Sequence, residues 1–137
     1  MKKAIKILVI DKEEIILKSV KRALKNEGEI EFIITTCGTA LDGLKLIRSD
    51  KFDLIFFDLV LPGMSGSELL RRIKNMYPDV PVIVMSGYSG SGINRFENTS
   101  LPEDIRDNIS GFLLKPFTTE EIKSVIYENF SFEDEER

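Results

Sequence analysis

Four polar residues of this sequence stand directly after short apolar runs, namely Asp11, Asp58, Ser86 and Lys115. A carboxylate or an ammonium at the end of a buried strand contributes nothing to a hydrophobic core, so its presence needs a chemical reason. Two carboxylates brought together repel each other unless they share a proton or a cation. A lysine supplies one cation and a divalent metal ion could supply another. The residue types therefore indicate an acidic site whose charge is balanced by cations.

The chain contains no histidine. This absence excludes Ser-His-Asp hydrolysis, general-base catalysis by histidine and most zinc sites. Any catalysis must therefore use carboxylates, lysine, hydroxyl groups or a hard metal ion.

The elements that position these residues follow from the apolar pattern. Continuous apolar runs rich in Ile and Val are typical of strands covered on both faces of a sheet. Because such runs alternate with helical segments, they predict parallel pairing, right-handed crossovers and a doubly wound α/β sandwich of three layers. The predicted strands are Ile5–Ile10, Ile30–Thr35, Leu54–Phe57, Val82–Met85 and Phe112–Leu114.

The segments between the strands carry apolar residues at helical spacing. Two of the expected helices begin with a capping box, Ser65-x-x-Glu68 and Thr118-x-x-Glu121, in which both side chains satisfy free amide donors. The expected apolar faces hold Ile16, Val20, Ala23 and Leu24; Ala40, Leu44 and Ile47; Leu69, Ile73, Met76 and Tyr77; and Ile122, Val125, Ile126 and Phe130.

The place of a site follows from this architecture. In an open parallel sheet, ligands bind beyond the carboxyl ends of the strands. The four polar residues all follow strands, so we expect carboxylates, a hydroxyl and a lysine to converge on one edge of the sheet.

Composition sets further limits. The 137 residues fit one domain, and the net charge of −4 gives no reason to expect nucleic acid as a partner. No apolar stretch approaches the ~20 residues that span a bilayer, so no membrane association is expected. The single cysteine, Cys37, cannot form an internal disulfide and fits a reducing compartment. We expect a cytoplasmic protein with one domain over residues 4–130 and an acidic tail over 131–137.

Three segments together resemble response-regulator receiver domains, over roughly residues 5–130. Segment 56–66, Phe-Phe-Asp-Leu-Val-Leu-Pro-Gly-Met-Ser-Gly, resembles the phosphoacceptor segment of that family. Segments 82–87 and 112–117 resemble its fourth-strand and fifth-strand motifs. The resemblance implies a flavodoxin-like fold with a five-stranded parallel sheet in the order 2-1-3-4-5. It also implies a phosphorelay signalling switch rather than a metabolic enzyme.

The resemblance implies roles for individual residues. Asp58 would accept a phosphoryl group from the phosphohistidine of a sensor histidine kinase or a histidine phosphotransfer protein. Lys115 and the Ser86 hydroxyl would contact the phosphoryl oxygens. Pro116 matches the cis-proline position of the family, and Phe112 matches its switch aromatic.

Position 12 departs from the family pattern. The first strand of a receiver usually ends in two adjacent acids, the second of which contacts Mg²⁺ directly, whereas here Lys12 follows Asp11. At ~5 Å and an effective dielectric constant near 20, a unit charge and a divalent ion interact by roughly 7 kcal/mol, so the change is large. One alternative is a weak Mg²⁺ site of Asp11, Asp58 and the Val60 backbone carbonyl, completed by Glu13 or water. In the other, the Lys12 ammonium lies between Asp11 and Asp58 and replaces part of the metal's charge.

A second departure lies between Ser86 and Lys115, an interval several residues longer than is usual in the family. The extra residues fall in 87–110, which is rich in Gly, Pro and polar residues, with a faint helical pattern over Glu103–Ile109. We therefore expect an atypical fourth helix and an unusual partner surface.

The sequence argues against two other functions and leaves a third open. A phosphatase of the haloacid dehalogenase type needs a second acid two residues after its nucleophile, where Val60 stands. A nucleotide or flavin binder needs a phosphate loop, and neither a Walker nor a G-x-G-x-x-G pattern is present. A pseudo-receiver, which keeps the fold and partner surface without phosphoryl transfer, stays open because of Lys12. The chain could stand alone or belong to a hybrid kinase or a longer regulator.

Overall fold

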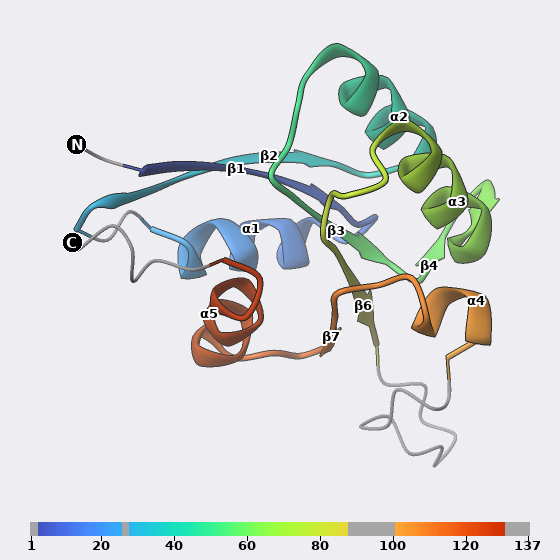
Figure 1. The fold of residues 1–137 in the computed structure, drawn as a ribbon. Coiled ribbons are helices and arrows are strands. Elements are labelled where there is room, and N and C mark those ends of the chain that lie inside the picture. The colour runs from blue at the N-terminus through green and yellow to red at the C-terminus, as the bar shows by residue number, and fades with distance from the viewer. Residues whose placement is uncertain (1–2, 26–27, 88–100, 131–137) are drawn as a thin grey trace.

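A computed structural model describes residues 3–25, 28–87 and 101–130 of the chain. Its centre is a five-stranded parallel sheet in the order β2-β1-β3-β6-β7 (Figure 1). The short strands β4 and β5 form a separate ribbon, so β6 and β7 are the fourth and fifth strands of the main sheet. The strand order is therefore the predicted 2-1-3-4-5, and the predicted fold class is confirmed. The sheet strands are β1 (Lys3–Ile10), β2 (Ile30–Cys37), β3 (Leu54–Asp58), β6 (Val82–Ser86) and β7 (Gly111–Leu114).

Helices cover both faces of the sheet and complete the three layers (Figure 1). Successive side chains of a strand point to opposite faces, and β1 shows this alternation: Ile5, Ile7 and Val9 pack on one face, Leu8 and Ile10 on the other. The first face is covered by α1 (Glu14–Ala23) and α5 (Thr119–Tyr127), and the second by α2 (Ala40–Ser49), α3 (Gly66–Met76) and α4 (Glu103–Arg106).

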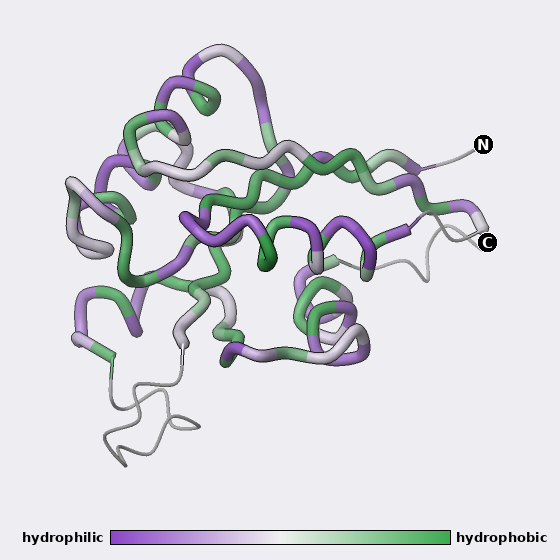
Figure 2. The backbone as a smooth tube through the Cα atoms, turned by 180° about the vertical axis from the view of Figure 1, so that it is seen from behind, coloured by the Kyte–Doolittle hydropathy of each residue, from purple (hydrophilic) through white to green (hydrophobic). Residues whose placement is uncertain are grey.

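Hydropathy follows these layers. Figure 2 shows hydrophobic segments along the central strands and hydrophilic segments along the outer sides of the helices. All of the residues predicted for the apolar helix faces are buried in the two core clusters or packed against them. The amphipathic spacing of the sequence therefore identified the buried face of each long helix.

The fourth helix is atypical, as expected, and shorter than the predicted span. The sequence predicted helical character over Glu103–Ile109, whereas α4 ends at Arg106. The side-chain amide of Asn108 donates to the backbone carbonyl of Asp104. In a longer helix the backbone N–H of Asn108 would donate to this carbonyl instead. The helix still anchors itself to the core, because Ile105 is buried. Residues 88–100 of the segment predicted to be irregular lie outside the described residues, as does the predicted tail over 131–137.

One of the two predicted capping boxes is complete. At α5 the Thr118 hydroxyl accepts from the backbone N–H of Glu121, and the Glu121 carboxylate accepts from the backbone N–H of Thr118. At α3 only the first half forms, from the backbone N–H of Glu68 to the Ser65 hydroxyl. The reciprocal half was predicted wrongly, because the Glu68 carboxylate pairs with two arginines on its own helix, Arg71 and Arg72.

The segment after β3 forms a small hairpin that the sequence analysis did not predict. It consists of the antiparallel strands β4 (Val60–Leu61) and β5 (Met64–Ser65). Pro62 and Gly63 form the turn between them, and Gly63 has a φ of 83°, which suits a residue without a side chain. The Pro-Gly pair was the available signal. The hairpin fixes the backbone directly after Asp58.

Candidate functional site

The register of the central strands brings the predicted residues to one edge. Ile10 of β1 pairs with Phe57 of β3, so Asp11 and Asp58, the residues that follow this pair, emerge side by side. On the other side of β3, Asp58 pairs with Met85 of β6. The expectation that strand ends would gather the polar residues is therefore met for both aspartates.

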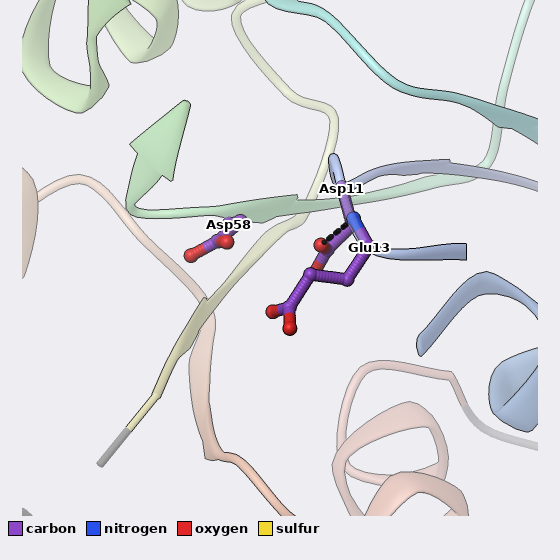
Figure 3. Close-up of side chains that lie close together, drawn as sticks. All are labelled: Asp11, Glu13 and Asp58. Atoms are coloured by element: carbon purple, nitrogen blue, oxygen red, sulfur yellow. Dashed lines mark hydrogen bonds between the residues drawn. The ribbon is translucent and has the colours of Figure 1, made fainter. Parts of the chain in front are cut away.

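Three carboxylates meet at this edge, and one of them was only a secondary candidate. Figure 3 shows the side chains of Asp11, Glu13 and Asp58 close together, at the ends of β1 and β3. One oxygen from each lies within 4.8 Å of the others. Asp11 and Asp58 are buried, with exposed fractions of 0% and 5%, whereas the Glu13 side chain is half exposed at the rim.

Lys115, at the end of β7, holds the three acids together. Its Nζ atom lies 2.5 Å from Asp11 Oδ2, 3.0 Å from Asp58 Oδ2 and 3.1 Å from Glu13 Oε1. The lysine is itself buried, with 6% of its surface exposed. A single ammonium thus balances part of the charge of three acids, as the residue types indicated. The peptide bond between Lys115 and Pro116 is cis, the isomer expected at this position.

Each buried aspartate is anchored by one oxygen and presents the other. Asp11 Oδ1 accepts from the backbone N–H of Glu13 at 2.8 Å (Figure 3), and Asp58 Oδ1 accepts from the backbone N–H of Val60 at 3.2 Å. Both are Asx-type turns, in which the side chain bonds to the backbone two residues further on. The Oδ2 atoms face Lys115. The chain therefore fixes the orientation of both carboxylates before any ligand binds.

Burial and charge set the protonation of this cluster. Burial raises the pKa of Asp11 above its ordinary value, against the opposing effects of Lys115 and the Glu13 amide. Burial by itself lowers the pKa of Lys115, but its hydrogen bonds to Asp11 and Asp58 and the charges of these acids outweigh burial, so the pKa of Lys115 is raised. The lysine therefore stays an ammonium ion at neutral pH.

The Lys12 side chain is exposed, and among the described residues it forms no ion pair. Of the two alternatives that the sequence left open, one placed the Lys12 ammonium between Asp11 and Asp58. In the structure Lys115 lies there instead. A lysine among the carboxylates was expected from the residue types, whereas its contact with Glu13, 102 positions away in the chain, was not predicted.

The remaining predicted residues surround the cluster. Ser86 ends β6 next to Leu114 of β7, and its backbone carbonyl accepts from the N–H of Lys115 at 2.8 Å. Within the described part of the chain the Ser86 hydroxyl forms no hydrogen bond to Asp58 or Lys115. Phe112 is half-buried and packs against the core cluster under α2, α3 and α4. Val60 lies in the hairpin with its side chain exposed.

The residues fit a hard divalent cation. All candidate ligands are oxygens, which Mg²⁺ and Ca²⁺ prefer. Asp11 Oδ2 is fully buried and, among the described residues, lacks a hydrogen bond of good geometry despite its close contact with Lys115. An oxygen in that state is suited to accept a metal ion. Lys115 occupies the space between the carboxylates, so a cation there has to displace its ammonium.

The chain is a doubly wound α/β domain that brings a buried strand-end aspartate, a second aspartate and a lysine to one edge of its sheet, and similarity to known proteins identifies its family. The model of the response regulator receiver domain family matches residues 7–127. The chain therefore belongs to this family. Receiver domains serve phosphorelay in two-component signalling and are signalling modules rather than metabolic enzymes.

Individual relatives support this assignment. The chain is 30% identical over 123 residues to the two-component response regulator ARR11 of Arabidopsis thaliana and 26% identical over 130 residues to the sensor kinase CckA of Brucella abortus. The matches cover 88% and 93% of this chain but only 22% and 13% of these relatives. The chain thus spans a small part of the length of the curated relatives that it matches.

Solved structures give the same result. A CheY-like receiver domain protein from Methanospirillum hungatei is 27% identical, with a TM-score of 0.76 over 98% of this chain and 100% of its own. NtrX from Brucella abortus is 29% identical, with a TM-score of 0.77 over 98% of this chain and 29% of its own. No helix among the described residues is both long and apolar enough to cross a membrane.

Proposed function

We propose that this receiver domain is a phosphorelay switch in which Asp58 accepts a phosphoryl group from a phosphohistidine. The donor would be a sensor histidine kinase or a histidine phosphotransfer protein. The observation that carries the proposal is the state of Asp58: it is buried at the end of β3, with Oδ1 held by the Val60 amide and Oδ2 presented 3.0 Å from the Lys115 ammonium.

Phosphoryl transfer to Asp58 requires little beyond this geometry. Asp58 Oδ2 attacks phosphorus, an oxygen–phosphorus bond forms, and the phosphorus–nitrogen bond of the donor breaks with its electron pair left on the histidine nitrogen. Phosphoryl transfer depends mainly on positioning and on neutralising the phosphoryl oxygens. Lys115 supplies one positive charge at the site. Asp11, Asp58 and the Val60 backbone carbonyl would hold a Mg²⁺ ion, which would supply further positive charge.

We propose that the residues that respond to phosphorylation lie on β6 and β7. Ser86 stands two residues beyond Val84, which pairs with Phe112, so the hydroxyl and the aromatic ring occupy neighbouring strands. We propose that the Ser86 hydroxyl binds a phosphoryl oxygen and that Phe112 changes its packing in response. The surface around α4, β7 and α5 would then change for a downstream protein partner. We place this domain at residues 4–130 of a cytoplasmic protein.

A pseudo-receiver is the second candidate, and one observation favours it. Lys12, which directly follows Asp11 and is exposed, is a cation at the position where receivers usually carry a metal-binding acid. In this case the domain keeps its fold and partner surface, and phosphorylation is weak or absent.

One experiment separates the two candidates. The protein is incubated with acetyl phosphate, with and without Mg²⁺, and its intact mass is measured for wild type, Asp58→Asn and Lys12→Asp. A phosphoryl adduct on wild type that is lost in Asp58→Asn supports the switch. An adduct that forms only in Lys12→Asp identifies a pseudo-receiver disabled at one residue. An adduct of equal yield on Asp58→Asn excludes Asp58 as the acceptor.

A further inference from the structure

Glu13 differs from the two aspartates in how it is held. Its backbone N–H bonds to Asp11, but its carboxylate has no bond to the backbone and contacts only Lys115, at 3.1 Å, among the described residues. Half of its side chain is exposed. Glu13 is therefore the member of the cluster that can move, whereas Asp11 and Asp58 are anchored.

The charge of the cluster is incomplete. Three carboxylates surround one ammonium, so two negative charges remain without a partner inside the cluster. Uncompensated carboxylates at such short separation repel one another and favour an added cation. Lys12 does not neutralise these charges, because its side chain is exposed and takes no part in the cluster.

The spacing of the oxygens suits a single ion. Two oxygens on opposite sides of one Mg²⁺ lie about 4.2 Å apart, given metal–oxygen distances of about 2.1 Å. The oxygens of Asp11, Glu13 and Asp58 all lie within 4.8 Å of one another. A small movement of Glu13 therefore brings all three to one ion, provided that Lys115 leaves.

We propose that Glu13 supplies the third carboxylate ligand of a divalent cation, in place of the acid that position 12 lacks, and that the cation and Lys115 compete for the same three carboxylates. Cation binding then releases Lys115 from Asp11 and Glu13, so that its ammonium is free to meet the incoming phosphoryl group. The inference rests on the proposed function, since it assigns the cation site of that same switch.

The test is direct binding of Mn²⁺, which has the same ligand preference as Mg²⁺ and is counted as free ion by electron paramagnetic resonance. Wild type is compared with Glu13→Gln and with Glu14→Gln. The second is a matched control, because Glu14 is the next acid along the chain, is exposed and lies outside the cluster. We expect Glu13→Gln to weaken Mn²⁺ binding by roughly tenfold or more, since affinity follows the number of charged ligands. Glu14→Gln should bind as wild type does.

Lys115→Met tests the competition. Removing the ammonium should strengthen Mn²⁺ binding, and adding Glu13→Gln to this variant should weaken it again. The inference is overturned if wild type binds no Mn²⁺ at millimolar concentration, if Glu13→Gln and Glu14→Gln behave alike, or if Lys115→Met binds no tighter than wild type. The proposed function fails separately: Mn²⁺ binding that depends on Glu13, without a phosphoryl adduct on Asp58, would keep the metal site and reject the switch.

Discussion

Removing the ammonium at the centre of the acidic cluster is the perturbation whose effect the structure predicts most fully. Lys115→Met keeps the length and packing of the buried stem and deletes only the charge. In the wild-type protein this charge lies 2.5 Å from Asp11 and 3.0 Å from Asp58, both of them buried. The variant therefore leaves two buried aspartates facing each other without a counterion.

The size of the effect follows from burial. At an effective dielectric constant of 20, a charge pair at 3.0 Å has a gross attraction of about 5.5 kcal/mol. Removing one partner of a buried pair typically lowers the free energy of unfolding by about 3–5 kcal/mol, because the other partner is left uncompensated. Since the cluster opens to solvent on the Glu13 side, we expect about 3 kcal/mol for Lys115→Met at pH 8.

The loss should depend on pH in a defined direction. Burial raises the pKa of Asp11 above its ordinary value in the wild type, and removing the Lys115 ammonium removes the hydrogen bond and the charge that oppose this effect. A carboxyl group whose folded-state pKa is raised binds its proton more tightly when folded. It destabilises the fold at high pH and ceases to do so as pH falls through the folded-state pKa. The deficit of Lys115→Met should therefore shrink between pH 8 and pH 5.

Urea unfolding of wild type and variant at pH 8 and pH 5 measures this. Lys6→Met is the matched control, because Lys6 also lies 2.5 Å from an aspartate, Asp50, but that pair is exposed to solvent. An exposed pair contributes about 0–1 kcal/mol, so this control should change little at either pH. A loss in Lys115→Met that is no larger than that of the control, or that is independent of pH, refutes the electrostatic reasoning.

Three further predictions concern the scaffold. Thr118→Ala removes half of the capping box of α5 and should lower the free energy of unfolding by about 1 kcal/mol in urea titrations. Gly66→Ala places a methyl group 2.9 Å from the side chain and 3.1 Å from the carbonyl of Leu59, and should cost about 1–3 kcal/mol, whereas Gly87→Ala meets no atom of the described residues within 4 Å and serves as its control. Burial raises the pKa of Cys37 to about 11, so its alkylation by iodoacetamide at pH 8 should be roughly a hundredfold slower in the folded protein than in urea, and equal rates would contradict the structure.

The fold was accessible from the sequence because local pattern and topology agree. Runs such as Leu54–Phe57 are apolar throughout, which only a strand covered on both faces requires, and parallel strands in a doubly wound sheet bring their carboxyl ends to one edge. The sequence alone therefore predicted that Asp11 and Asp58 lie together. The start of α5 was predictable for a similar reason, because the partners of the Thr118 cap are three residues apart.

Side-chain contacts that depend on competing or distant partners could not be predicted from the sequence. The Ser65–Glu68 pattern matched a capping box, but nearby arginines bind the glutamate instead. Lys115 was predicted to point at the acceptor, yet nothing local in the sequence indicated that it would also reach Glu13 from another strand. The side-chain direction of Lys12 likewise depends on how the first helix begins. The departure at position 12 was visible in the sequence, whereas the side chains that contact Asp11 and Asp58 depend on tertiary structure.

The most direct measurement of the central claim is chemical localisation of the phosphoryl group. An acyl phosphate on an aspartate is reduced by borohydride to homoserine, which tandem mass spectrometry locates within a peptide. After incubation with acetyl phosphate and Mg²⁺, reduction and digestion, we predict homoserine at position 58 and unmodified aspartate at position 11. Homoserine at any other aspartate, or at none while a phosphoryl adduct persists on the intact protein, would contradict the account.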